Sequence, residues 1–86
     1  MDNPSHIGFS VFDSKIGAFA SPFFAPSRGA AVRAFSDEVK RDGSDFAKHP
    51  EDYILFQLCH YDDKTGVLAP LTAPEQVAKA SDYVEV

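Results

Sequence analysis

The 86 residues are enough for one domain, 1–86, and too few for two hydrophobic cores; residues 1–5 are expected to be flexible. A hydrophobic share of 44% and an aromatic share of 13% are typical of a folded chain and exclude intrinsic disorder. The net charge of −5 excludes strong non-specific binding to nucleic acid, unless the basic residues gather on one surface.

The N-terminal part of the chain predicts a β-hairpin. Ile7, Phe9 and Val11 alternate with small residues, as in a strand that is buried on one side. After a turn, a second strand is expected over residues 18–24. It should end early or lie at a sheet edge, because Pro22 cannot donate a hydrogen bond to a neighbouring strand.

The next element is a helix over residues 28–42. Ser27 can cap its start by accepting a hydrogen bond from the backbone, and Gly43 is suited to end it. The spacing of the apolar residues places one stripe along the helix, formed by Val32, Phe35 and Val39. This stripe should pack against a sheet.

The segment from Tyr53 to Tyr61 is nearly all apolar, which is typical of a central strand covered on both faces. We expect the helix to cover Ile54, Phe56 and Leu58. The opposite face would then carry Tyr53, Leu55, Gln57, Cys59 and Tyr61.

The C-terminal part predicts a hairpin partner and a short helix. A short strand is expected over residues 67–71. Thr72 and Glu75 have the spacing of a capping box, which predicts a helix to about Ala80. Residues 82–86 could be frayed or form a final strand. The expected fold is α+β with the order β-β-α-β-β-α, in which one long helix covers one face of a four-stranded, mainly antiparallel sheet.

The sequence has no arrangement of residues suited to catalysis, so we expect a protein that is neither an enzyme nor dependent on a cofactor. Catalytic serine motifs and phosphate-binding loops are both missing from it. Cys59 and His60 are strand neighbours that point to opposite faces, which disfavours a shared metal. The histidines fall in three different predicted elements: His6, His49 and His60. A carboxylate cluster is conceivable, but turn aspartates more often bond to their own backbone: Asp13, Asp62 and Asp63.

Two binding surfaces remain as alternatives. Aromatic side chains and a basic helix could together bind single-stranded DNA; the contacts would be Arg28, Arg33, Lys40, Arg41, Tyr53 and Tyr61. In the second alternative, the apolar reverse face of the sheet is a dimer or partner interface. Its residues would be Phe19, Phe23, Tyr53, Leu55 and Tyr61. The negative net charge favours the interface.

Several short motifs occur in an order known from phage proteins. They include Val11-Phe12-Asp13-Ser14-Lys15 and Ala34-Phe35-Ser36-Asp37, and the most specific is His49-Pro50-Glu51-Asp52-Tyr53. Over roughly residues 8–80 the chain resembles the small nonstructural protein of the gokushovirus-like microviruses, which are single-stranded DNA bacteriophages.

The resemblance implies a nonstructural protein associated with DNA replication, from a family without a defined active site. We therefore expect an accessory protein in the host cytoplasm that acts as a homodimeric adaptor for a phage or host replication protein. Direct binding of single-stranded DNA and a role as scaffold or minor virion component are the alternatives. The single cysteine and the start of the chain fit the cytoplasm, and no apolar run could cross a membrane.

Overall fold

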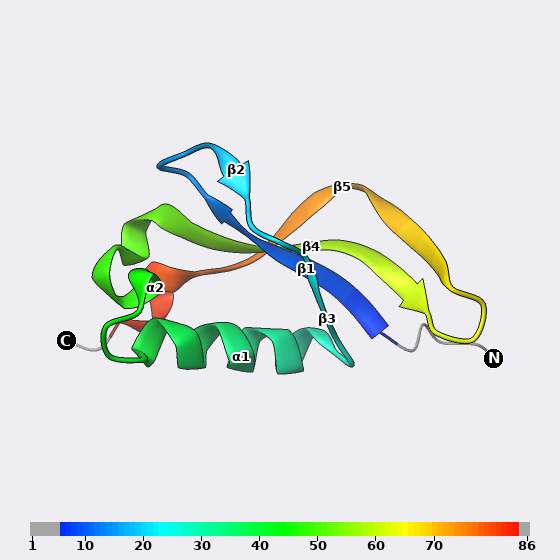
Figure 1. The fold of residues 1–86 in the computed structure, drawn as a ribbon, viewed down its shortest axis with the longest axis horizontal. Helices are drawn as coiled ribbons and strands as arrows, with labels where there is room; N and C mark the ends of the chain where they lie inside the picture. Colours follow the sequence, from blue (N-terminus) through cyan, green and yellow to red (C-terminus); the bar gives the residue numbers. More distant parts are fainter. Residues whose placement is uncertain (1–5, 85–86) are drawn as a thin grey trace.

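The computed structural model describes residues 6–84, in which a twisted antiparallel sheet lies above one long helix (Figure 1). The strands are β1 (His6–Asp13), β2 (Ala18–Phe19), β3 (Phe23–Ala25), β4 (Tyr53–Asp62) and β5 (Val67–Lys79). The helices are α1 (Arg28–Lys40) and α2 (Asp45–Lys48), with two 3₁₀ turns, η1 (Pro50–Asp52) and η2 (Ala80–Tyr83). The predicted α+β fold is confirmed. The prediction that residues 1–5 are flexible concerns residues outside the described range.

The segment that begins at Tyr53 is an interior strand, as predicted. The sheet order is β2-β1-β4-β5, and β3 pairs with β1 on the same edge as β2. The predicted second strand is thus interrupted at Pro22 and divided into β2 and β3, because proline cannot complete the ladder there.

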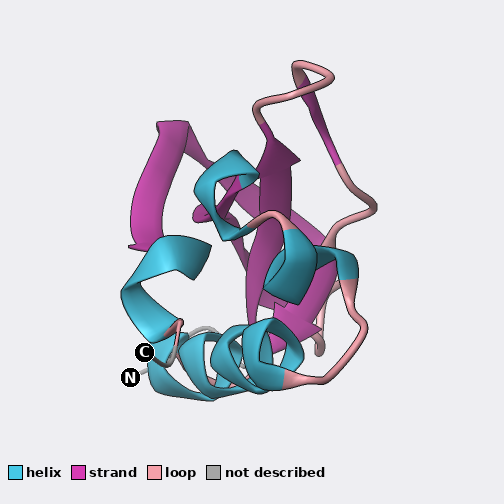
Figure 2. Cartoon of the chain, turned by 90° about the vertical axis from the view of Figure 1, so that its left-hand side faces the viewer, coloured by secondary structure: helices cyan, strands magenta, loops and turns pink. Residues whose placement is uncertain are grey.

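Helix α1 forms where its capping signals placed it. The Ser27 hydroxyl accepts a hydrogen bond from the backbone nitrogen of Ala30 at 3.1 Å. The helix ends at Lys40, two residues before the predicted end, and Gly43 adopts a positive φ of 84° in the connection to α2. Figure 2 shows α1 beneath the sheet, with the shorter helical segments gathered at one end of it.

The hydrophobic core lies between the sheet and α1. Its members come from every layer of the fold: Phe9, Val11, Ala25, Ala31, Phe35, Val39, Leu55, Ala78 and Ala80. Leu55 is fully buried there, whereas Phe56 contacts aromatic rings on the opposite side of the sheet.

The predicted facing is therefore wrong by one residue in the first half of β4, residues 53–57. Leu55 and Gln57 pair with Val11 and Phe9 of β1, and paired residues project from the same face. They must accordingly face the helix. A strand that is apolar on both sides carries no local signal for this choice, because either face could be the buried one.

Strand β4 also contains a bulge. Gly8 pairs with Cys59 and Phe9 with Gln57, which leaves Leu58 as an extra residue. The alternation of side chains reverses beyond it, so Cys59 and Tyr61 share a face with Phe56 and lie opposite α1, as predicted.

The predicted C-terminal helix is wrong, because β5 continues through Thr72 and Glu75 as far as Lys79. Pairing with β4 outweighs the local capping signal, and it places Ala78 in the core beside Leu55. The next residues form η2 rather than a final strand, and residues 85 and 86 lie outside the described range. Within the described part of the chain, no helix is both long and apolar enough to cross a membrane.

Candidate functional site

The candidate site is the face of the sheet that lies opposite α1. Phe9 of β1 is buried beneath the sheet against α1, so the even-numbered residues of this strand project from the other face. Their partners on β2, β3 and β4 share that face, because directly paired residues of antiparallel strands point the same way. We call the following residues the aromatic face: His6, Phe12, Phe19, Phe24, Phe56 and Tyr61.

The rings of the aromatic face contact one another in two groups. In the first group, the Phe12 and Phe19 centroids are 4.9 Å apart, and Phe56 lies 5.5 Å from Phe19. In the second group, the Phe24 and Tyr61 centroids are 5.3 Å apart. Phe19 is 45% exposed and Phe24 is 46% exposed, so each group presents one ring to solvent. These contacts hold the exposed rings in fixed positions.

Small residues of β1 lie between the two groups. A Cβ atom on Gly8 would lie 2.5 Å from the Cys59 Sγ and 3.0 Å from the Phe24 ring, so only glycine fits there. Ser10 is fully buried, and its hydroxyl donates to the Ala20 carbonyl at 2.7 Å. The rings of Phe24 and Tyr61 can therefore pack directly over the backbone of β1.

The aromatic face is free of negative charge in a chain with 13 carboxylates. Within residues 6–84, the register assigns no Asp or Glu of any strand to this face. Its β5 margin carries Gln76, paired with Phe56, and Lys79, paired with Ile54. Leu68, paired with Tyr61 and 53% exposed, extends the apolar surface.

The basic residues predicted to bind DNA lie elsewhere. Arg28 donates hydrogen bonds of 2.7 and 3.1 Å to the Gln57 side chain and forms an ion pair with Glu75, which ties the start of α1 to the helix side of the sheet. Arg41 pairs with Glu38 at 2.6 Å, and this hydrogen bond lowers the pKa of the Glu38 carboxyl. Two of the predicted phosphate contacts are thus already neutralised.

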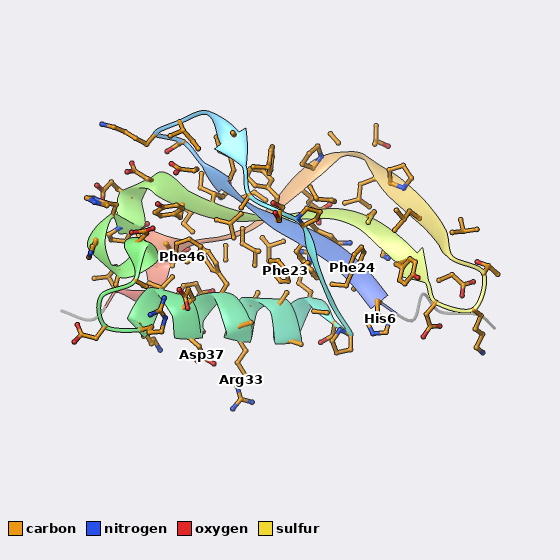
Figure 3. The ribbon with its side chains drawn as sticks, in the orientation of Figure 1. His6, Phe23, Phe24, Arg33, Asp37 and Phe46 are labelled. Atoms are coloured by element: carbon orange, nitrogen blue, oxygen red, sulfur yellow. The ribbon has the colours of Figure 1, made fainter. Side chains whose placement is uncertain are left out.

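The other two basic residues are exposed on the helix. Arg33 projects from α1 away from the sheet, as Figure 3 shows. Lys40 is exposed in the last turn of α1, where a cation stabilises the helix dipole. The structure therefore does not bring the basic helix residues and the aromatic face together.

Two of the aspartates considered for a carboxylate cluster form hydrogen bonds within their own turns instead. Asp13 accepts a hydrogen bond from the Lys15 backbone, and Asp62 accepts one from the Lys64 backbone. Asp13 pairs with Tyr53 at the start of β4, whereas Asp62 lies at its other end. The interpretation of Asp13 and Asp62 as turn formers is confirmed.

Comparison with known families places the chain among phage proteins. The family model described as Phage ORF5 protein matches residues 7–83. The chain belongs to the Phage ORF5 protein family. Comparison with curated proteins and with solved structures found no match. The predicted phage family is confirmed at this level, and the narrower prediction of a microvirus replication protein stays a prediction.

In this member of the Phage ORF5 family, the predicted interface residues divide between the two faces. Phe19 and Tyr61 lie on the aromatic face. Phe23 stacks on Phe9 with centroids 5.8 Å apart, on the helix side, where Leu55 is also buried.

Tyr53 also lies on the helix side, with its ring 4.5 Å from that of Phe46. Burial raises the pKa of the Tyr53 phenol, and the negative charges of Asp13, Asp45 and Asp52 raise it further. Tyr53 is therefore a packed residue in a negative environment, unsuited to contact a phosphate backbone.

Four residues of the aromatic face escaped prediction: His6, Phe12, Phe24 and Phe56. Phe12 was accessible to sequence reasoning, because the alternation that buries Phe9 and Val11 places it on the opposite side. Phe24 and Phe56 depend on pairing with Gly8 and Ser10, which no local pattern specifies.

Proposed function

We propose that this protein is a non-enzymatic phage accessory protein that acts by binding partners through its aromatic face, and that a second copy of the chain is one of them. The observation that supports this most directly is the exposure of Phe19 and Phe24 on a sheet face to which no strand carboxylate within residues 6–84 is assigned. Contiguous exposed aromatic surface is uncommon on monomeric proteins and marks interaction sites.

A second copy fits this face by charge and by symmetry. Two chains that each carry a net charge of −5 repel one another, so a stable contact needs a surface free of negative charge. In a two-fold dimer the same patch is used twice, which a neutral apolar face permits. Burial of this face would also stabilise a domain that is too small to form a large core.

Light scattering on the purified chain tests the dimer. We expect a species of twice 9.4 kDa at tens of micromolar protein. Phe19→Ser or Phe24→Ser should weaken the dimer about 30-fold, the effect of losing about 2 kcal/mol at an interface hot spot. Ile16→Ser is the matched control, because Ile16 is 72% exposed in the β1–β2 turn, outside the aromatic face. A wild-type species of 9.4 kDa at high micromolar concentration would refute the dimer.

A second candidate function is direct binding of single-stranded DNA, and the same face favours it. Partly exposed aromatic rings on the sheet face that carries Lys79 resemble the platforms on which unpaired bases stack, and each stacked base contributes about 1–3 kcal/mol. Fluorescence anisotropy with labelled oligonucleotides at low and moderate salt tests this function. Phe19→Ser should abolish binding and Arg33→Ala should not. No binding at tens of micromolar protein in low salt would exclude it.

Within the phage life cycle, we infer an adaptor role in genome replication or in its coupling to packaging. The support is the resemblance over residues 8–80 together with membership of a phage family. The test is a phage in which Phe19→Ser and Phe24→Ser are combined, with double-stranded and single-stranded phage DNA measured in infected cells. A selective loss of phage DNA supports the adaptor. Normal DNA with defective particles would indicate a scaffold or minor virion component instead.

A further inference from the structure

A group of metal-ligating side chains lies at the turn that leads into β4, away from the aromatic face. One ligand atom from each of His49, Glu51 and Asp52 lies within 4.8 Å of the other two. A cation with bonds of about 2.0–2.2 Å holds any two of its ligands within about 4.4 Å, so a small side-chain rotation would complete the site.

The backbone of η1 brings these side chains together. His49 ends α2, where its N–H donates to the Asp45 carbonyl at 2.9 Å, and its own carbonyl accepts from the Asp52 N–H at 3.0 Å. Pro50 occupies the first position of η1, where its fixed φ favours the turn. The chain therefore reverses within three residues, and their side chains converge.

The end of β1 lies against this group of side chains. The Asp52 carbonyl accepts hydrogen bonds from the Ser14 N–H at 2.8 Å and from the Ser14 hydroxyl at 3.0 Å, which fixes η1 against β1. The two segments enclose a pocket of about 250 Å³. Its lining is mostly polar and charged: Asp13, Lys15, His49, Glu51, Asp52 and Tyr53.

The pocket has the charge and the donor atoms that a cation requires. Three of its lining residues are carboxylates, and Lys15 is the one ammonium among the described residues that line it. Within residues 6–84, the side chains of His49, Glu51 and Asp52 have no hydrogen bond or ion pair that would compete with a metal.

We propose that His49, Glu51 and Asp52 form a binding site for a divalent transition-metal cation, and that the Asp13 carboxylate, which lines the same pocket, adds to its negative charge. An imidazole nitrogen combined with carboxylate oxygens suits Zn²⁺ or Mn²⁺ better than Mg²⁺ or Ca²⁺, which prefer oxygen ligands alone. A bound cation would fix η1 to β1 and stabilise the start of the central strand. The site is independent of the proposed binding function, because none of its residues belongs to the aromatic face.

Calorimetric titration of the full chain with ZnCl₂ tests the site. We expect one Zn²⁺ per chain. Loss of an outer-shell partner of a metal ligand already costs about 10–100-fold in affinity, so His49→Ala and Glu51→Gln should each weaken binding at least tenfold. Lys15→Ala should strengthen binding, because it removes a like charge from the pocket. Mg²⁺ binding should be weaker and should not respond to His49→Ala.

Two control variants and a thermal melt separate this site from other Zn²⁺ ligands. His6→Asn removes an imidazole on the aromatic face, and Asp37→Asn removes an exposed carboxylate on α1; neither should change Zn²⁺ affinity. Zn²⁺ should raise the melting temperature of the wild type but not of His49→Ala. No Zn²⁺ binding at 100-micromolar metal, or equal binding by wild type, His49→Ala and Glu51→Gln, would overturn the proposal.

Discussion

The two faces of the sheet are built from the same strands but differ in what covers them. On the helix side, Phe9 and Leu55 are fully buried against α1. On the aromatic face, Phe19 and Phe24 remain nearly half exposed. The faces are similar in hydrophobicity, so hydrophobicity alone does not distinguish a core from a binding surface. The difference lies in which side the helix packs on.

Neighbouring residues of β4 show how sharply the two faces are separated. Leu55 lies in the core, whereas Ile54 pairs with Phe12 and faces away from α1. Both are branched aliphatic residues of the same size. Replacing each of them by alanine therefore compares how much the two faces of the sheet contribute to the free energy of unfolding.

The largest expected effect is the loss of stability in Leu55→Ala. Truncation of a fully buried leucine leaves a cavity and costs about 2–5 kcal/mol. Ile54→Ala should cost less than half as much, because Ile54 is only partly buried. Urea unfolding at low micromolar protein, followed by circular dichroism, gives both values. If Ile54→Ala lowered the free energy of unfolding more than Leu55→Ala, then Ile54 rather than Leu55 would face α1, contrary to the structure.

The sequence predicts features that depend on residues close together in the chain, and fails where a feature depends on distant residues. Ser27 caps α1 through a hydrogen bond to Ala30, three residues along the chain, so the start of the helix was predictable. The end was less so, because Arg41 caps the helix before Gly43 is reached. Which side chains of β4 face α1 depends on its pairing with β1, about 50 residues away in the chain, and on the bulge at Leu58 in that pairing. The same distinction explains β5, where the Thr72–Glu75 capping pattern is local and the overriding ladder with β4 is not.

The candidate site divides in the same way. Phe19 and Tyr61 were predicted from the aromatic content of their strands. Phe24 and Phe56 were not, because their position on the aromatic face follows from non-local register. The group of ligands at His49 was not predicted either, because its side chains are brought together only by the turn η1.

An intermediate effect is expected for Gly8→Ala on the aromatic face. The added Cβ would overlap the Cys59 Sγ, and overpacking of this kind costs about 1–3 kcal/mol. Displacement of Phe24 should also weaken the dimer in light scattering. Gly29→Ala is the matched control, because nothing lies closer to its Cβ than 3.9 Å and alanine favours the helix.

The double variant Gly8→Ala/Cys59→Ala sharpens this test. Removal of the sulfur makes room for the new methyl group, so the double variant should be more stable than the sum of the two single effects implies. Strict additivity in urea unfolding would show that the strain does not arise between these two residues.

The smallest expected effect concerns Tyr53, which links the helix side to the pocket at η1. Burial raises the pKa of its phenol above that of an unfolded tyrosine, about 10, and the charges of Asp13, Asp45 and Asp52 add to the rise. The folded state therefore favours the neutral phenol. Its contribution to stability is complete below about pH 10 and disappears as the pH rises through the folded-state pKa. Alkaline titration followed by absorbance near 295 nm should contain a late component that Tyr53→Phe removes. If Tyr53→Phe removed a component at about pH 10 and left the late component, the ring would be in water. The packed helix side of the sheet would then end at Leu55 and would not extend to the turn where the metal site is proposed.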